Sequence, residues 1–84
     1  MVYQISIKKR ALKALEKINE PYYSPIKKAI IGLSHNPRPN GFKKLKGRDA
    51  FRIRVAHYRI IYEIFDETLI IDIIDLGHRK EIYG

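Results

Sequence analysis

The chain has 84 residues, 45% of them hydrophobic and 31% charged, a size that leaves room for one small domain, residues 1–84. It contains no cysteine, which excludes a disulfide-stapled scaffold and a thiolate metal site. No apolar stretch approaches the roughly 20 residues of a membrane-spanning helix, and the N-terminal residues lack the charged region of a signal peptide. We therefore expect a cytoplasmic protein.

The charge is strongly basic and unevenly distributed. Lysine and arginine number 17 against 9 acidic residues, a net charge of +8, and most of this excess lies between residues 38 and 59, where Asp49 is the only acid. A confined basic stripe is expected for a protein that binds a polyanion, nucleic acid first and an anionic membrane surface second. The alternative is a solvated basic face that keeps a small domain in solution.

The first half of the chain predicts a strand followed by a helical hairpin. Residues 2–7 alternate in polarity, as in a half-buried strand. From Lys8 apolar residues recur at helical spacing until Asn19-Glu20-Pro21 ends the helix, and Ser24 is expected to cap a second helix with Pro25 at its first position. The expected apolar stripes are Ala11, Leu12, Leu15 and Ile18, and Ile26, Ala29, Ile30 and Leu33.

The second half predicts a sheet. Helix breakers fill residues 35–41, and a loop then leads to strands expected at 51–55, 58–65 and 69–76, with turns at 56–57 and 66–68 and an end at Gly77. The order β-α-α-β-β-β predicts an α+β domain: an N-terminal strand, a helical hairpin and a three-stranded antiparallel meander. We expect the hairpin to cover one face of an antiparallel sheet.

Residues 51–55 combine two alternating sets of side chains. Period 2 directs Phe51, Ile53 and Val55 toward the helices and places Arg52 and Arg54 together on the other face, about 7 Å apart. With a turn at 56–57, Arg59 comes within reach on the next strand if it shares that face. Guanidinium groups grip phosphate oxygens in a planar fork, so this face and the preceding lysines suit a phosphodiester.

Cleavage of a phosphodiester without a metal needs a base, an acid and cations for the developing charge. His78, Arg79 and Tyr83 lie within six residues after the last predicted strand and offer such groups. The alternative for this tail is a frayed terminus. The other histidines fit a helix end, His35, and a hairpin turn, His57; the three lack metal-ligand spacing, so no metal and no cofactor is expected.

Four blocks follow one another along the second half of the chain: Lys43-Lys44-Leu45-Lys46-Gly47, Phe51-Arg52-Ile53-Arg54-Val55, Tyr58-Arg59-Ile60-Ile61-Tyr62-Glu63-Ile64 and Gly77-His78-Arg79-Lys80-Glu81-Ile82-Tyr83. In their order and spacing, and with the helix block Lys9-Arg10-Ala11-Leu12-Lys13-Ala14-Leu15 before them, they resemble a known family over the whole chain. This family is the RelE-type toxins of bacterial and archaeal toxin-antitoxin systems.

The resemblance implies a microbial-ribonuclease-like fold and an endoribonuclease that cuts mRNA in the ribosomal A site by 2′-hydroxyl attack. By the same resemblance Arg52 and Arg54 fall at a basic catalytic pair, Arg59 and Arg79 at phosphate-stabilising arginines, and Tyr83 at a catalytic tyrosine. The implied RNA-binding residues are Lys43, Lys44, Lys46 and Arg48. The implied partners are the ribosome, mRNA and a small antitoxin protein.

The acid and base follow from the residues that can exchange protons. Arg52 stands where relatives often have lysine, and its pKa is too high for proton abstraction, so we expect it to act electrostatically. Nearby guanidinium charges lower the pKa of a tyrosine and favour its phenolate, so Tyr83 is expected as the base. The same charges disfavour an imidazolium, so His78 is the weaker candidate for the acid. Two other functions are considered: a ParE-like toxin that inhibits DNA gyrase by binding, and a catalytically silent RNA-binding module.

Overall fold

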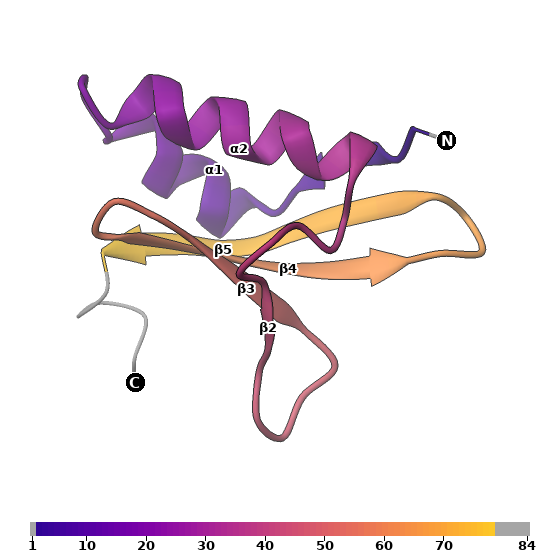
Figure 1. Ribbon diagram of the computed structural model, residues 1–84. Helices are drawn as coiled ribbons and strands as arrows, with labels where there is room; N and C mark the ends of the chain where they lie inside the picture. The colour runs from indigo at the N-terminus through magenta and orange to yellow at the C-terminus, as the bar shows by residue number, and fades with distance from the viewer. Residues whose placement is uncertain (1, 79–84) are drawn as a thin grey trace.

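The computed structural model describes residues 2–78, which form two helices on one face of a five-stranded sheet (Figure 1). In chain order the elements are β1 (Gln4–Ile7), α1 (Lys9–Glu16), α2 (Tyr23–His35), β2 (Lys43–Lys44), β3 (Phe51–Val55), β4 (Tyr58–Phe65) and β5 (Ile70–His78). Among these described residues, no helix is long and apolar enough to cross a membrane. The predicted α+β class is confirmed, and the predicted three-stranded meander is approximate, because the short strand β2 precedes it and the sheet has five strands.

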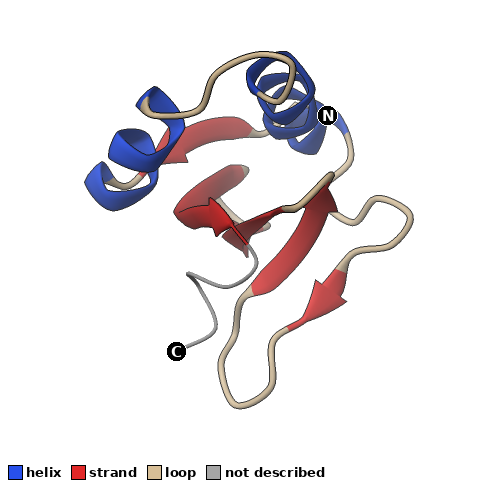
Figure 2. Ribbon diagram, turned by 90° about the vertical axis from the view of Figure 1, so that its left-hand side faces the viewer, coloured by secondary structure: helices blue, strands red, loops and turns tan. Residues whose placement is uncertain are grey.

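The strand order in the sheet is β1-β5-β4-β3-β2. Strands β2 to β5 are antiparallel neighbours, and the 56–57 turn joins β3 to β4 as predicted. The hairpin of β2 and β3 extends away from the helix layer, and its loop at residues 45–50 lies furthest from the helices (Figures 1 and 2). The face of the sheet that the helices cover is therefore the core face, and neither helix covers the opposite face.

The core lies between the helix layer and the sheet. Ile26 and Leu33 of α2 and Ile60 and Ile71 of the sheet are at most 1% exposed. Burying such side chains removes apolar surface from water at about 25 cal/mol per Å² and is the main term that holds the layers together. Leu12 is 43% exposed, so the first helix buries a narrower stripe than its sequence pattern predicts.

The expectation of an all-antiparallel sheet is wrong for β1. This strand pairs in parallel with β5, with Gln4 opposite Ile70 and Ile7 opposite Ile73. Backbone bonds extend the pairing at both ends, from the Gln4 amide to the Leu69 carbonyl and from the Lys8 amide to the Ile73 carbonyl, each 2.8 Å. Alternation in a sequence fixes which side chains share a face, but it carries no information on the direction of the neighbouring strand.

Strand boundaries also differ from the prediction. Lys43 and Lys44, expected in a loop, form the short strand β2 because they pair with Arg52 and Phe51. Strand β5 continues through Gly77 to His78, since β4 supplies pairing partners back to Tyr58.

The start of α2 is also capped differently. Ser24 lies inside the helix, and the Glu20 carboxylate accepts hydrogen bonds from its hydroxyl and, at 3.1 Å, from its amide. These two bonds lower the pKa of Glu20. An acceptor four residues upstream thus satisfies a helix-end amide that Ser24 was expected to help cap.

A β-bulge interrupts the pairing of β4 and β5. Ile61 faces Asp75 while Tyr62 faces Ile73, so Ile74 is the extra residue. Ile73 and Leu76 are both buried on the helix side, although they are three residues apart. The bulge therefore shifts the inward phase of β5 by one residue, and its effect reaches every position from Asp75 onward.

Tyr62 connects the sheet to the loop that follows α2. Its ring is completely buried, and its hydroxyl donates a hydrogen bond of 2.7 Å to the Pro37 carbonyl. Burial raises the pKa of Tyr62 to about 12. Nearby, Asp66 accepts bonds from Arg38 at 2.9 Å and from the Tyr3 hydroxyl at 2.5 Å, which lower the pKa of Asp66. These contacts fix the loop that connects α2 to β2 against the end of the sheet at Tyr62 and Asp66.

We predict that Tyr62→Phe lowers the free energy of unfolding by about 1 to 2 kcal/mol, because the buried Pro37 carbonyl loses its donor. Urea unfolding with an unchanged m-value is the measurement. Tyr22→Phe is the matched control, since Tyr22 is 39% exposed, and it should change stability by less than about 0.5 kcal/mol. Equal effects of the two variants would show that the Pro37 bond adds nothing.

Candidate nucleic-acid interface

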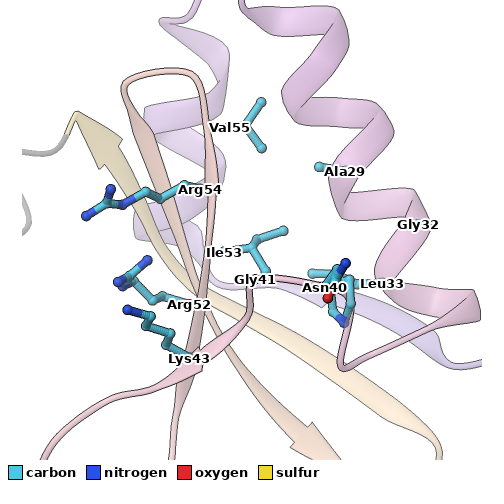
Figure 3. A pocket seen from close by; sticks show the side chains of 11 residues that line it. Ala29, Gly32, Leu33, Asn40, Gly41, Lys43, Arg52, Ile53, Arg54 and Val55 are labelled. Carbon is cyan, nitrogen blue, oxygen red and sulfur yellow. The ribbon is translucent and has the colours of Figure 1, made fainter.

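The register of β2, β3 and β4 gathers four cations on the sheet face opposite the helices. Arg54 is the cross-strand partner of Arg59, and Arg52 is the partner of Lys43. Cross-strand partners share a face, with Cβ atoms about 5 Å apart. Figure 3 shows the cationic ends of Lys43, Arg52 and Arg54 on one side of β3, with Ile53 and Val55 on the other. We call the four residues of this set the arginine face: Lys43, Arg52, Arg54 and Arg59.

The three arginines differ in exposure. Arg54 is exposed, Arg52 is half-buried, and Arg59 is only 3% exposed. The expected grouping of Arg52, Arg54 and Arg59 on one face is therefore what the structure contains, with neither Arg52 nor Arg54 in the core. A guanidinium held with little access to water interacts more strongly with an anion than one in bulk solvent.

Two like-charged cross-strand pairs on one face carry an electrostatic cost. Directly opposed like charges destabilise a sheet by a few tenths of a kcal/mol or more per pair. Lys43 with Arg52 and Arg54 with Arg59 are two such pairs. A phosphate bound between the two members of such a pair would be attracted to both cations.

The 45–50 loop carries further cations beside this face. Its ends are joined by a 2.8 Å bond from the Leu45 amide to the Ala50 carbonyl, and Ala50 is fully buried. Gly47 has a φ of +78°, a conformation that side chains rarely adopt, which lets the tip turn tightly. The predicted RNA-binding residues are all exposed here and on β2: Lys43, Lys44, Lys46 and Arg48.

His78 does not join the arginine face. It is the cross-strand partner of Tyr58, on the helix side of the sheet, and the two rings are 5.8 Å apart at nearly right angles. His57 lies 6.0 Å from the His78 ring, and Tyr22 lies 5.7 Å from Tyr58. The structure thus places His78 on the face opposite the arginines, and its expected role in proton transfer stays a prediction. Arg79 and Tyr83 lie outside the described residues.

A groove between α2 and β3 was not foreseen from the sequence. It has a volume of about 520 Å³, and its walls include Ala29 and Leu33 of α2 with Ile53 and Val55 of β3 (Figure 3). Small residues on α2, Ala29 and Gly32, were the available signal. Within residues 2–78 there is no group of three or more side chains suited to hold a metal ion.

Comparisons with known proteins agree with this geometry. Residues 5–83 match the family described as the ParE toxin of the type II toxin-antitoxin system, parDE. The mRNA interferase toxin RelE of Escherichia coli K12 is 30% identical over 89 residues, covering 100% of this chain and 93% of that protein. The putative toxin RelE1 of Methanocaldococcus jannaschii is 31% identical over 87 residues, covering 99% and 97%.

Solved structures give the same result. RelE in the archaeal RelE-RelB complex of Pyrococcus horikoshii OT3 superposes with a TM-score of 0.84 at 29% identity, covering 96% of this chain and 99% of that one. The isolated E. coli RelE toxin gives 0.79 at 29% identity, covering 96% and 90%. The chain belongs to the RelE/ParE superfamily of type II toxin-antitoxin toxins, and it is a RelE-type member.

Proposed function

We propose that this toxin is a ribosome-dependent endoribonuclease that cuts mRNA in the A site and so stops translation. The observation that carries the proposal is the pairing of Arg54 with Arg59 and of Lys43 with Arg52 on one face. That face meets the need of phosphoryl transfer for cations at developing negative charge. Similarity to the E. coli mRNA interferase toxin RelE over the whole chain supports the same activity.

In the proposed reaction the 2′-oxygen attacks the adjacent phosphorus, the P–O2′ bond forms and the P–O5′ bond breaks. The products are a 2′,3′-cyclic phosphate and a 5′-hydroxyl, so the proton lost by the 2′-oxygen balances the one gained by the 5′-oxygen. Arg52, Arg54 and Arg59 stabilise the phosphorane charge, and Arg79 adds to them. Tyr83 is proposed as the base, because His78 lies on the helix side of the sheet. No step requires a metal ion.

A small antitoxin is the proposed protein partner. Related RelE toxins have been solved bound to RelB, including those of P. horikoshii and E. coli. The net charge of +8 favours a partner whose contacting segment is acidic. Such a segment laid over the arginine face would compete directly with the RNA phosphate.

The test of the activity is a translating extract to which the purified toxin is added, with mRNA 5′ ends mapped. We expect cuts in phase with codons, poor cleavage of naked RNA and no loss of activity on chelation beyond its effect on ribosomes. A ParE-like gyrase inhibitor, which the matched family description favours, would leave mRNA intact and block DNA supercoiling. Intact mRNA with normal supercoiling would leave only the silent RNA-binding module.

We predict that Arg59→Gln lowers the single-turnover rate on programmed ribosomes by about 10² to 10³, the loss expected for one preorganised charge-stabilising group. Lys27→Gln removes one cation from the exposed surface of α2 and is the matched control, with an expected change below about twofold. Because Arg59 is buried, unfolding of the variant is measured alongside. A folded Arg59→Gln protein with the wild-type rate would remove Arg59 from the site.

We predict that the single-turnover rate depends more on Tyr83 than on His78, the two candidates for proton transfer. Tyr83→Phe should cost at least 10² in single-turnover rate with ribosome binding nearly unchanged, because it removes a proton and little contact area. His78→Ala should cost less than about tenfold, since His78 packs against Tyr58 on the helix side. The reverse ranking would assign the proton transfer to the histidine.

A further inference from the structure

A second basic hollow lies on the other side of the sheet, beneath α1. It has a volume of about 500 Å³. Its helix wall carries Arg10, Lys13 and Lys17, and its sheet wall carries Tyr58, Leu76 and His78. We call it the α1 hollow. The three cations are exposed and follow one another over about 10 Å along α1 and its C-cap, at 1.5 Å per residue.

The charge of this hollow is only partly balanced. Arg10 lies 3.5 Å from Asp75, the carboxylate of the bulge in β5. Lys13 and Lys17 have no acidic residue within ion-pair distance among the described residues. The excess of cations therefore lies at the C-terminal end of α1, with Lys13 in its last turn and Lys17 at its C-cap, beside the apolar side chains of Ala14 and Ile18.

The sheet wall supplies rings. Tyr58 and His78 face each other at 5.8 Å, and His57 and Tyr22 continue the cluster. Aromatic faces beside a row of cations are the combination by which proteins hold single-stranded nucleic acid, because bases stack on rings and phosphates pair with cations. An acidic peptide would use the cations but would have no need for the rings.

The α1 hollow and the arginine face meet at the turn between β3 and β4. Arg54, His57, Tyr58 and Arg59 line a small hollow at this turn, and Tyr58 also lines the α1 hollow. His57 in turn contacts His78 on the far side. A strand leaving the arginine face can therefore pass around the turn without leaving basic or aromatic surface.

We propose that the α1 hollow binds a short stretch of single-stranded RNA backbone, continuous with the arginine face around the 56–57 turn. The inference rests on the proposed function only in taking RNA as the substrate. Lys13 and Lys17 contact phosphates, and Tyr58 and His78 form the stacking wall. The RNA comes either from the mRNA beyond the cleavage site or from ribosomal RNA beside it.

The first experiment measures binding without cleavage. A fluorescent single-stranded RNA of about 12 nucleotides, within the roughly 4 to 16 nucleotides that a single-strand-binding fold covers, is titrated with wild type and with Lys13→Gln/Lys17→Gln. Each phosphate contact adds about 0.7 to the salt slope, so loss of two should weaken binding about 25-fold at 0.1 M salt and lower the slope by about 1.4. Lys27→Gln/Lys28→Gln has the same net charge and is the matched control on α2.

Equal losses for the two double variants would overturn the inference, because general charge and not the hollow would then account for binding. So would wild-type affinity in Lys13→Gln/Lys17→Gln. Both pairs are exposed, so unfolding should be unchanged in both variants. The binding readout separates this inference from the proposed function: the hollow can hold RNA in a protein that never cleaves, and a cleaving protein can lack it.

The second experiment identifies the source of the RNA. Cleavage on programmed ribosomes is measured with mRNA that ends at the A-site codon and with mRNA that extends beyond it. A defect of Lys13→Gln/Lys17→Gln in KM on the longer mRNA alone assigns the hollow to mRNA. A defect on both assigns it to ribosomal RNA, and no defect on either contradicts a role in RNA binding on the ribosome.

Discussion

The pairing of β3 with β4 is the constraint on which both the core and the arginine face depend. Ile53 opposite Ile60 closes the core, while Arg54 opposite Arg59 builds the charged face. Because side chains alternate with period 2, a slip of one residue would turn the guanidiniums of Arg52 and Arg54 into the core. Their desolvation forbids that register. The same charges that we propose to bind phosphate therefore also help to select the fold.

Sequence periodicity predicts the parts of this fold in which local pattern and tertiary context agree. Strands β3 and β4 were predicted with the bounds that they have, because alternation and the turn at 56–57 leave one solution. The parallel pairing of β1 with β5 was missed, since it depends on which edge of the sheet the first strand reaches. The cap of α2 was missed because Glu20 acts from outside the helix.

The candidate site was also predictable only where local pattern determines which face a side chain lies on. Arg52 and Arg54 follow from alternation, and Arg59 from the short turn. The prediction ended the last strand at Gly77 and put His78 in the tail, whereas the structure extends β5 to His78, and the extra residue at Ile74 sets the face on which His78 lies. The lysines of α1 have the spacing of a solvated helix face, and only the packing of α1 against the end of β5 brings them opposite Tyr58 and His78.

The pairing of β1 with β5 limits when this toxin can complete its fold. Gln4 and its partner Ile70 are separated by nearly the whole domain, and contacts so distant in sequence form late because loop closure must precede them. During synthesis β1 and α1 emerge long before the strand on which they pack. A nascent chain that still lacks β5 cannot complete the sheet. The ribosome that synthesises the toxin must therefore add β5 before the folded toxin exists.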